Sequence, residues 1–433
     1  MTLALAGTIV FTTNAWDPMP TLNQWWAGIT ALSKPAPAWT KRLGGSPDIA
    51  AVMPANVVVV ASRGFVEAYQ RSDGRHLWRH DAYWALPAGD VVVMRQKPKN
   101  PDVDKAPDRG YVVLDPLSGA VIWSDREATS VWAYTDAIVD LTCPDDGGCV
   151  VRARRHHGNG SQMWAVPVSG NGRTIAGPNP ALAGTRDPAR WFADAAAGSP
   201  GRLPPVIGVP IAGLIHVIDT QEGKYIREAR PPDRESRLAF SGERLLLSQS
   251  SPAETGCRQS IEAFHYRTEK SQWRKDGNDL DTASGAGCEQ RRDPLGAGGY
   301  LVGIQPDSRP VLIFAEDGTE RWVGVAGERV LATDGLLAVI EGADRKTVKV
   351  IDLNGDNNTV WSGLLGLRPE AAITPDLIIL RDTDKGRLIV LSHRGVTPLG
   401  EWKTETTVVG YGSDAIVIAR ARTIGVLSLP VRV

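Results

Sequence analysis

Four oxygen-bearing side chains alternate along one short segment of the sequence and could bind a calcium ion. They stand at positions 1, 3, 5 and 7, like the first ligands of a calcium loop, and belong to Asp352, Asn354, Asp356 and Asn358. Position 12, where such a loop carries an acid, is Gly363. Because Asn, Asp and Gly also favour tight turns without an ion, the sequence favours a hairpin turn, with a calcium site as the alternative.

Two adjacent histidines, His156 and His157, are the other candidate metal ligands. Adjacent side chains point to opposite faces of a strand, so the sequence predicts no shared metal site. The chain contains no P-loop, no Gly-x-Ser-x-Gly elbow and no His-Glu-x-x-His motif. We therefore predict no catalytic residue, no bound metal and no cofactor.

The four cysteines fall into two pairs and indicate an oxidising compartment. Cys143 and Cys149 flank Pro-Asp-Asp-Gly-Gly, a tight turn, whereas Cys257 and Cys288 lie further apart. Neither pair has the Cys-x-x-Cys spacing of a zinc site or a redox dithiol. An even number of separated cysteines fits two structural disulfides, and we predict the pairs 143–149 and 257–288. Reactive thiols are the alternative.

A repeated sequence pattern, called the phrase below, predicts the strands and turns that carry these residues. A β-rich run, a polar turn that usually holds Gly, and a strand ending in Trp recur, as in Ala68–Trp78 and Val113–Trp123. Units of about forty residues with three or four short strands are typical of β-propeller blades, and a large ring can fill the wedge between two blades. The copies at Val166–Ile175 and Val217–Ile226 lack the tryptophan. The predicted structural tryptophans are Trp39, Trp78, Trp123, Trp273, Trp322, Trp361 and Trp402.

The predicted fold is all-β, a single propeller of four-stranded blades over residues 36–433. Counting every phrase gives nine units. We favour eight blades, because one degenerate unit between residues 165 and 230 can be counted twice, and seven or nine are the alternatives. The C-terminal strands have no Trp-bearing outer strand of their own. Ala36–Trp39 can supply it, so we expect N- and C-terminal strands to close the ring and leave no open edge.

The phrase Ala-x-Asp-x-x-Thr-Gly-x-x-x-Trp resembles the tryptophan-docking repeat of quinoprotein-type (PQQ-like) propellers. That family includes quinone-dependent dehydrogenases and the non-enzymatic propeller of the bacterial outer-membrane barrel-assembly machinery. The resemblance implies the fold and says little about function, because the repeated residues are structural. The Asp position of the repeat is matched only by Asp115, Asp219 and Asp352. A dehydrogenase of this family is expected to carry adjacent cysteines or a catalytic Asp beside calcium, and the sequence shows neither.

The N-terminal residues suggest a membrane tether. Residues 1–16 carry no charge, but their apolar run is shorter than the ~20 residues of a spanning helix. We interpret them as the remnant of a truncated signal anchor, with a frayed apolar tail as the alternative. Residues 17–35 begin with a capping box at Thr21–Gln24 and predict an amphipathic helix, which lies either at the lipid headgroups or against the propeller.

Long loops indicate which face binds a partner. In a four-stranded blade, the connections from second to third strand and from blade to blade share one face, and we place four insertions there: Arg95–Arg109, Arg152–Gly160, Ala176–Pro205 and Asp276–Gly298. Loops of this length are often functional, with solvated loops as the alternative. Basic candidates for binding an anionic partner are Arg95, Lys97, Lys99, Arg152, Arg154, Arg155, Arg291 and Arg292.

Charge and composition complete the functional prediction. The chain has 48 basic and 49 acidic residues, whereas a nucleic-acid-binding protein needs a basic excess to displace counterions. We predict a non-enzymatic scaffold on the extracytoplasmic face of the cell membrane, tethered through its N-terminus. Its expected partner is another envelope protein or an anionic envelope component, not nucleic acid. The alternative is an extracytoplasmic quinone-dependent oxidoreductase or other enzyme with a degenerate site in the propeller channel.

Overall fold

The computed structural model describes residues 37–97, 109–144, 147–170, 202–211, 214–229, 235–241, 243–254, 257–280, 283–284, 288–290, 299–366, 369–382, 384, 386–403 and 407–429. Regular structure in these ranges is almost wholly β, with a three-residue 3-10 turn at Pro54–Asn56. The predicted anchor at 1–16 and helix at 17–35 lie outside the described residues. A search of the described ranges finds no helix with the length and apolar character needed to cross a bilayer.

The strands form successive antiparallel units, numbered here in chain order. Units 1 to 4 consist of β2 (Pro47–Met53), β3 (Val57–Ser62), β4 (Phe65–Gln70) and the first half of β5 (His76–Ala88); the second half of β5, β6 (Val91–Gln96), β7 (Tyr111–Leu114) and β8 (Val121–Asp125); β9 (Ser130–Ala133), β10 (Ile138–Thr142), β11 (Cys149–Arg154) and β12 (Gln162–Val168); and β13 (Val206–Ile211), β14 (Leu214–Asp219) and β15 (Lys224–Ala229).

Units 5 to 9 continue the same pattern. They consist of β16 (Ser236–Ser241), β17 (Arg244–Pro252), β18 (Cys257–His265) and β19 (Ser271–Asp276); β22 (Tyr300–Ile304), β23 (Pro310–Phe314) and β24 (Glu320–Val323); β25 (Arg329–Thr333), β26 (Leu337–Glu341), β27 (Thr347–Asp352) and β28 (Thr359–Leu364); β29 (Pro369–Ile373), β30 (Leu377–Asp382), β31 (Arg387–Ser392) and β32 (Pro398–Lys403); and β33 (Thr407–Tyr411), β34 (Ala415–Arg420), β35 (Thr423–Ser428) and β1 (Trp39–Arg42). A two-stranded ribbon, β20 (Ala283–Ser284) and β21 (Glu289–Gln290), separates units 5 and 6.

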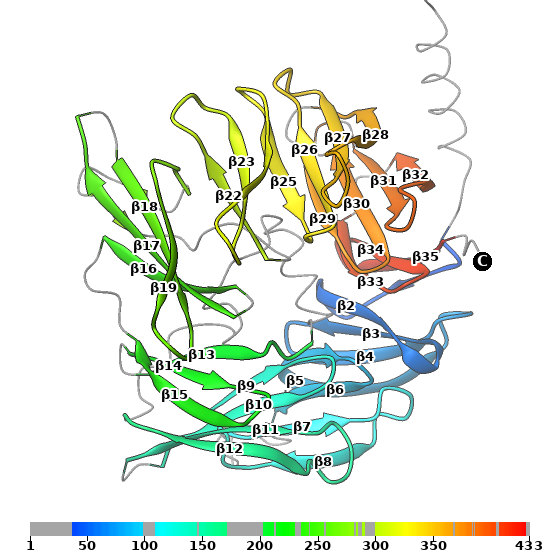
Figure 1. The fold of residues 1–433 in the computed structure, drawn as a ribbon. Coiled ribbons are helices and arrows are strands. Elements are labelled where there is room, and N and C mark those ends of the chain that lie inside the picture. Colours follow the sequence, from blue (N-terminus) through cyan, green and yellow to red (C-terminus); the bar gives the residue numbers. More distant parts are fainter. Residues whose placement is uncertain are drawn as a thin grey trace, which may run out of the picture.

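The units follow one another in a ring (Figure 1). The ring closes as predicted, because β1 pairs with β35 in the register Trp39↔Val426 to Arg42↔Thr423. Unit 9 therefore contains strands from both ends of the described chain. The first strand of unit 1 then packs beside the first strand of unit 9, β33.

The described strands form nine units, so the favoured count of eight is corrected to nine. One seven-stranded sheet holds two units, because β5 pairs with β4 at Asp81 and with β6 at Ala82. The region suspected of being counted twice contains the outer strands of two separate units, β12 and β15. The sequence count failed there because the tryptophan of β12 was not recognised as part of the repeat.

Tryptophans join neighbouring units in a repeated arrangement. Trp78, on the outer strand of unit 1, is 8% exposed, and its indole Nε1–H donates to the Pro116 carbonyl of unit 2 at 2.9 Å. Its ring lies against Gly119, whose φ is +68° and whose added Cβ would stand 2.6 Å from the ring. Equivalent ring-on-glycine contacts are Trp39 on Gly74, Trp123 on Gly160, Trp164 on Gly223 and Trp273 on Gly318. Each such position needs glycine for conformation and for space.

The seven predicted structural tryptophans all lie on outer strands, and an eighth was missed. Trp273 and Trp361 are half-buried, and the other five are buried. Trp164 on β12 is also buried, so the phrase placed without a tryptophan at Val166–Ile175 is wrong. Its signal is the same Gly-x-x-x-Trp spacing, from Gly160 to Trp164.

Units 4 and 5 are joined differently. Arg227 pairs with Val217 across the sheet, the register position that Trp78 holds opposite Ala68. The Arg227 Nη1 atom lies 3.0 Å from Glu269 Oε1 of unit 5. Glu269, with a φ of +55°, stands where five tryptophan seams have glycine. An ion pair therefore replaces the ring-on-glycine contact at this seam.

Candidate functional site

The antiparallel units give the ring two faces. The turn face carries the turns from first to second strand and from third to fourth strand of each unit. The loop face carries the connections from second to third strand and from one unit to the next. The basic candidates were predicted to lie on the loop face, but two of those described lie within a strand and one lies on the turn face.

Arg152 and Arg154 are not in a loop, which corrects the predicted insertion at Arg152–Gly160. Both lie on β11, the third strand of unit 3, and their side chains are only 18% and 17% exposed. Residues 155–161 form the turn from β11 to β12, which belongs to the turn face. The alternation of Arg with Val and Ala along this segment is a strand pattern, and it was read as a basic loop.

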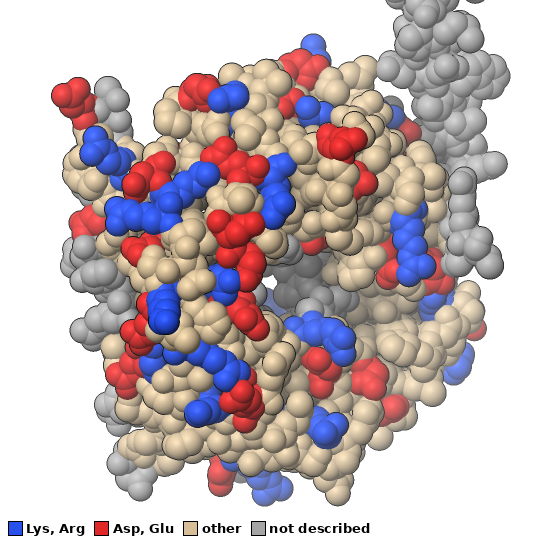
Figure 2. Space-filling view, viewed as in Figure 1, with Lys and Arg blue, Asp and Glu red and all other residues tan. Residues whose placement is uncertain are grey.

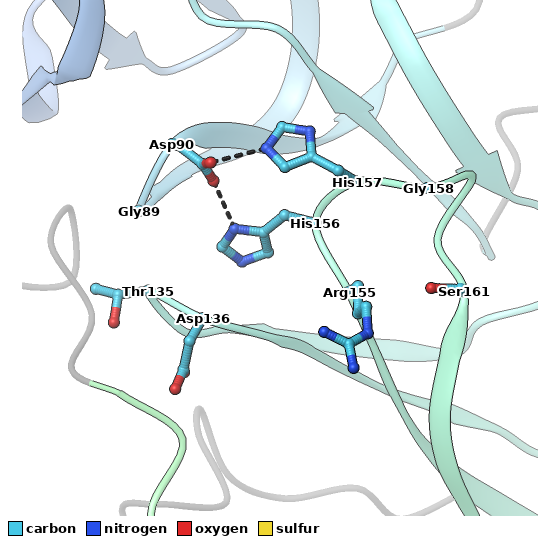
Figure 3. A pocket seen from close by; sticks show the side chains of 9 residues that line it. All are labelled: Gly89, Asp90, Thr135, Asp136, Arg155, His156, His157, Gly158 and Ser161. Carbon is cyan, nitrogen blue, oxygen red and sulfur yellow. Dashed lines mark hydrogen bonds and ion pairs between the residues drawn. The ribbon is translucent and has the colours of Figure 1, made fainter.

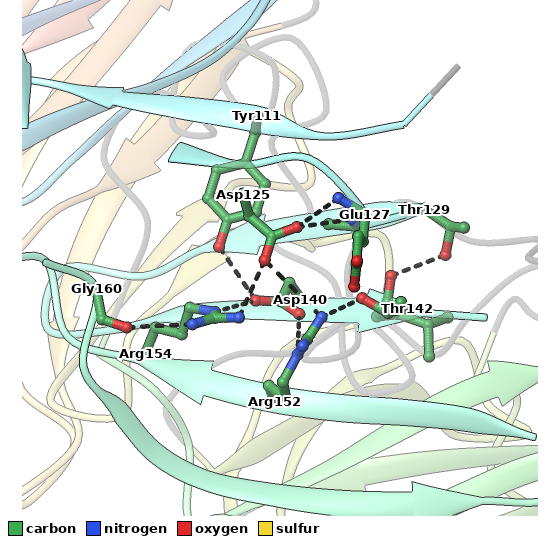
Figure 4. Close-up of polar contacts among 11 residues, drawn as sticks. Tyr111, Asp125, Glu127, Thr129, Asp140, Thr142, Arg152, Arg154 and Gly160 are labelled. Carbon is green, nitrogen blue, oxygen red and sulfur yellow. Dashed lines mark hydrogen bonds and ion pairs between the residues drawn. The ribbon is translucent and has the colours of Figure 1, made fainter. Parts of the chain in front are cut away.

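These two arginines join units 2 and 3 through buried carboxylates (Figure 4). Asp140 is fully buried and accepts hydrogen bonds from Arg152 Nε at 2.9 Å, Arg154 Nε at 2.7 Å and Tyr111 Oη at 3.1 Å. Arg154 Nη2 also lies 3.0 Å from Asp125 Oδ2. Burial, and then the Asp140 charge, raises the pKa of the Tyr111 hydroxyl. The network is structural, because removing one charge would leave its buried partner unpaired.

The other basic candidates are scattered. Arg95, on β6, donates to the Gly110 carbonyl, and Lys97 Nζ lies 5.7 Å from the Tyr83 ring centroid, so both stand at the loop face. Lys99, Arg291 and Arg292 lie outside the described residues. Figure 2 shows basic and acidic side chains interspersed around a central hollow on the face in view. That view shows no continuous basic surface.

An open cleft of about 600 Å³ lies on the turn face between units 2 and 3 (Figure 3). Three turns build it: the β5–β6 turn, the β9–β10 turn and the β11–β12 turn. The residues that line it are Gly89, Asp90, Thr135, Asp136, Arg155, His156, His157, Gly158 and Ser161. Of these, Arg155 is a predicted binding residue, and the two histidines are the disfavoured metal ligands of the sequence.

Both histidines bond to one carboxylate, so the expectation that they diverge is wrong. His156 Nδ1 lies 2.8 Å from Asp90 Oδ1, and His157 Nε2 lies 2.7 Å from Asp90 Oδ2. The rings converge because they belong to a turn and not to a strand. No group of three metal-binding side chains is found within the described ranges, and the two rings occupy the carboxylate themselves.

Two hydrogen bonds hold the His156 ring in the wall of the cleft. Its ring is 6% exposed, and Nε2 lies 3.0 Å from the Tyr134 carbonyl, which can only accept. Nδ1 faces the Asp90 carboxylate, so both ring nitrogens of His156 have an oxygen partner. Partial burial of Asp90 opposes ionisation, but hydrogen bonds from His157 and His156 outweigh it and lower the pKa of Asp90.

The segment of the calcium candidate forms the turn between β27 and β28. Asp352 Oδ1 accepts from the Asn354 N–H at 2.9 Å, and Asn357 adopts a φ of +57°. The Asn357 amide donates to the Arg321 carbonyl of unit 6 at 2.9 Å. This turn therefore meets the neighbouring unit in the way that the glycine turns do.

Both predicted disulfides are confirmed. Cys143 pairs with Cys149, with Cα atoms 4.2 Å apart, and Cys257 pairs with Cys288, at 5.7 Å. The first closes the β10–β11 hairpin, and the second ties unit 5 to the segment that leads into unit 6. Disulfides of this kind are typical of extracytoplasmic proteins.

Comparison with known proteins supports the fold and nothing finer. No protein-family model matches this chain, and no curated protein sequence matches it. Similar solved structures include BamB from Moraxella catarrhalis (14% identity, TM-score 0.41, 91% of this chain and 99% of that chain) and a quinohemoprotein alcohol dehydrogenase from Pseudomonas putida HK5 (12%, 0.42, 91% and 76%). A eukaryotic initiation factor matches at 10% identity with a TM-score of 0.50, over 90% of this chain and 93% of that chain. At these identities the likeness concerns the β-propeller fold alone.

Proposed function

We propose that this chain is a partner-binding propeller of the cell envelope, extracytoplasmic and tethered to the membrane through its N-terminal residues. The observation that carries the proposal is the polar cleft between units 2 and 3. It is built only from turns, on a ring whose strands are fixed by docked tryptophans. Binding residues commonly lie on loops that a rigid frame positions. The two disulfides support an oxidising compartment.

Site-specific photo-crosslinking in intact envelopes tests the binding site. A photoreactive side chain replaces Ser161, in the cleft, and, as a matched control, Thr359 on an exposed outer strand. We expect a discrete crosslinked adduct from position 161 and none from position 359. No adduct at position 161, or equal labelling at both positions, would refute the assignment of this cleft.

The non-enzymatic part of the proposal has its own test. The purified chain is incubated with pyrroloquinoline quinone and calcium in the presence of a redox dye and candidate alcohols. We expect no dye reduction above that of the cofactor alone. Reduction that requires the protein would favour the oxidoreductase alternative.

Carbonate washing of membranes tests the proposed tether. If the N-terminal residues anchor the chain, the protein stays in the membrane pellet after the wash.

A further inference from the structure

The carboxylates of the cleft already have partners on this chain. Asp90 is hydrogen-bonded to two histidines, His156 and His157. Asp136 accepts from the Leu203 N–H at 2.8 Å and lies 3.5 Å from Arg202 Nε. In each case the carboxylate at the cleft wall already has partners on this chain, so neither carboxylate calls for a cation from a ligand.

Arg155 carries the remaining charge of the cleft lining. It is exposed, and in Figure 3 its guanidinium lies between Asp136 and Ser161, across the cleft from Asp90. Within the described part of the chain, no carboxylate forms an ion pair with it. The Ser161 hydroxyl adds a hydrogen-bond donor on the same turn. The cleft therefore offers a ligand the guanidinium of Arg155 and a hydroxyl donor on the same turn.

We propose that this cleft binds an acidic peptide segment of the partner, with a carboxylate on Arg155. The proposal rests on the proposed function and names the chemistry of its partner. A guanidinium presents two parallel N–H donors that match a carboxylate. The volume of about 600 Å³ lies within the ~300–1,000 Å³ range of sites that enclose small ligands. A recess of this size fits a few side chains, whereas a bilayer surface needs an exposed, continuous basic face.

A second seam of the ring provides a matched control. His393 Nε2 lies 2.5 Å from Asp334 Oδ2, joining the third-to-fourth-strand turn of unit 8 to the first-to-second-strand turn of unit 7. This is the relation that His156 and Asp90 have between units 3 and 2. Arg394, next to His393, is exposed like Arg155, but it does not belong to the lining of the cleft. Arg155 and Arg394 therefore share face and charge and differ in the cleft.

The experiment measures binding of a fluorescein-labelled tetraglutamate peptide to the purified full chain by fluorescence anisotropy at low salt. Charge-assisted hydrogen bonds contribute enough that Arg155→Gln should weaken binding about tenfold or more, and Arg155→Lys should weaken it less. Arg394→Gln should bind like the parent. Equal affinity of the parent and Arg155→Gln, or equal losses in both Gln variants, would overturn the proposal.

Two further arms separate the alternatives. Sedimentation with phosphatidylglycerol vesicles should show no contribution from Arg155. Vesicle binding that needs Arg155, without peptide binding, would overturn the proposal in favour of a membrane surface. If crosslinking at position 161 succeeds and the peptide fails to bind, the cleft binds a partner, but the bound segment is not acidic. If crosslinking at position 161 fails, the proposed function itself is wrong.

Discussion

The seam between units 1 and 2 and the seam between units 4 and 5 use equivalent backbone positions for different side chains. In the first, the buried ring of Trp78 lies on Gly119 and its N–H is bonded. In the second, Arg227 reaches Glu269, which is 60% exposed. Neighbouring polar groups strengthen the second seam: Asp219, 1% exposed, accepts from Tyr266 Oη at 2.9 Å and pairs with an arginine of the same turn.

This difference shows which part of the repeat is interchangeable. At the five seams where the tryptophan covers a left-handed glycine, an added Cβ would clash with its side chain, so those positions require glycine. A charged pair needs only that its ends meet, and it tolerates a side chain on the turn. Burial of an aromatic ring stabilises without regard to salt, whereas an exposed ion pair is worth little and is screened.

Removing the ring should have the largest effect. Trp78→Ala deletes a buried indole between two units and should cost about 3–5 kcal/mol of unfolding free energy. Glu269→Gln, which discharges the exposed side of the ion pair, should cost at most about 1 kcal/mol. Urea denaturation followed by circular dichroism compares the two. Equal shifts of the midpoint would contradict the proposed difference between the seams.

Filling the glycine position comes next. Gly119→Ala places a Cβ 2.6 Å from the Trp78 ring, whereas Gly395, with a nearly equal φ of +70°, has no atom within 4 Å of an added Cβ. Gly395→Ala should cost about 1–2 kcal/mol for the backbone alone. Gly119→Ala should cost about 1–3 kcal/mol more, because the ring must shift. Thermal midpoints of the two variants measure the difference. Identical midpoints would show that the contact between the added Cβ and the Trp78 ring costs nothing.

Rebuilding the tryptophan seam between units 4 and 5 sharpens the comparison further. Arg227→Trp alone puts a ring against Glu269 and should destabilise, and Glu269→Gly alone removes the ion pair. The double variant should recover stability, with a coupling of about 1 kcal/mol between the two sites. A double-mutant cycle in urea gives this number. Additive effects would show that the two positions do not form an equivalent dock.

Lowering the pH should weaken the seam between units 4 and 5, and we expect this to be the smallest of the effects on stability. Burial of Asp219 opposes its ionisation, but hydrogen bonds from Glu222 N–H and Tyr266 and the charge of Arg267 outweigh it and lower its pKa. A lowered native pKa stabilises fully above the unfolded value of ~3.9, and that stabilisation is lost as pH falls through the native pKa. Thermal midpoints measured from about pH 6 to about pH 3 should fall less in Asp219→Asn than in the parent. A larger acid loss in the variant would reverse the assignment.

Features set by short spacings could be predicted from the sequence. The Gly-x-x-x-Trp repeat, the two disulfides and the closure of the ring by Trp39 follow from local turn chemistry and from the positions of cysteines in that pattern. A tryptophan four residues after a left-handed turn residue meets the next unit wherever the repeat occurs. The same rule, applied to Gly160 and Trp164, would have given the correct number of units.

Long-range side-chain contacts were decided by the tertiary structure. The sequence predicted a basic loop at Arg152 and Arg154, and only the fold shows that they form ion pairs with Asp140 and Asp125. The cleft depends on Asp90, which lies 66 residues before His156 and in another unit. Sequence spacing encodes which residues share a strand or a turn. Which turns of neighbouring units face each other depends on the packing of whole sheets, so charges there are balanced by partners that no local pattern identifies.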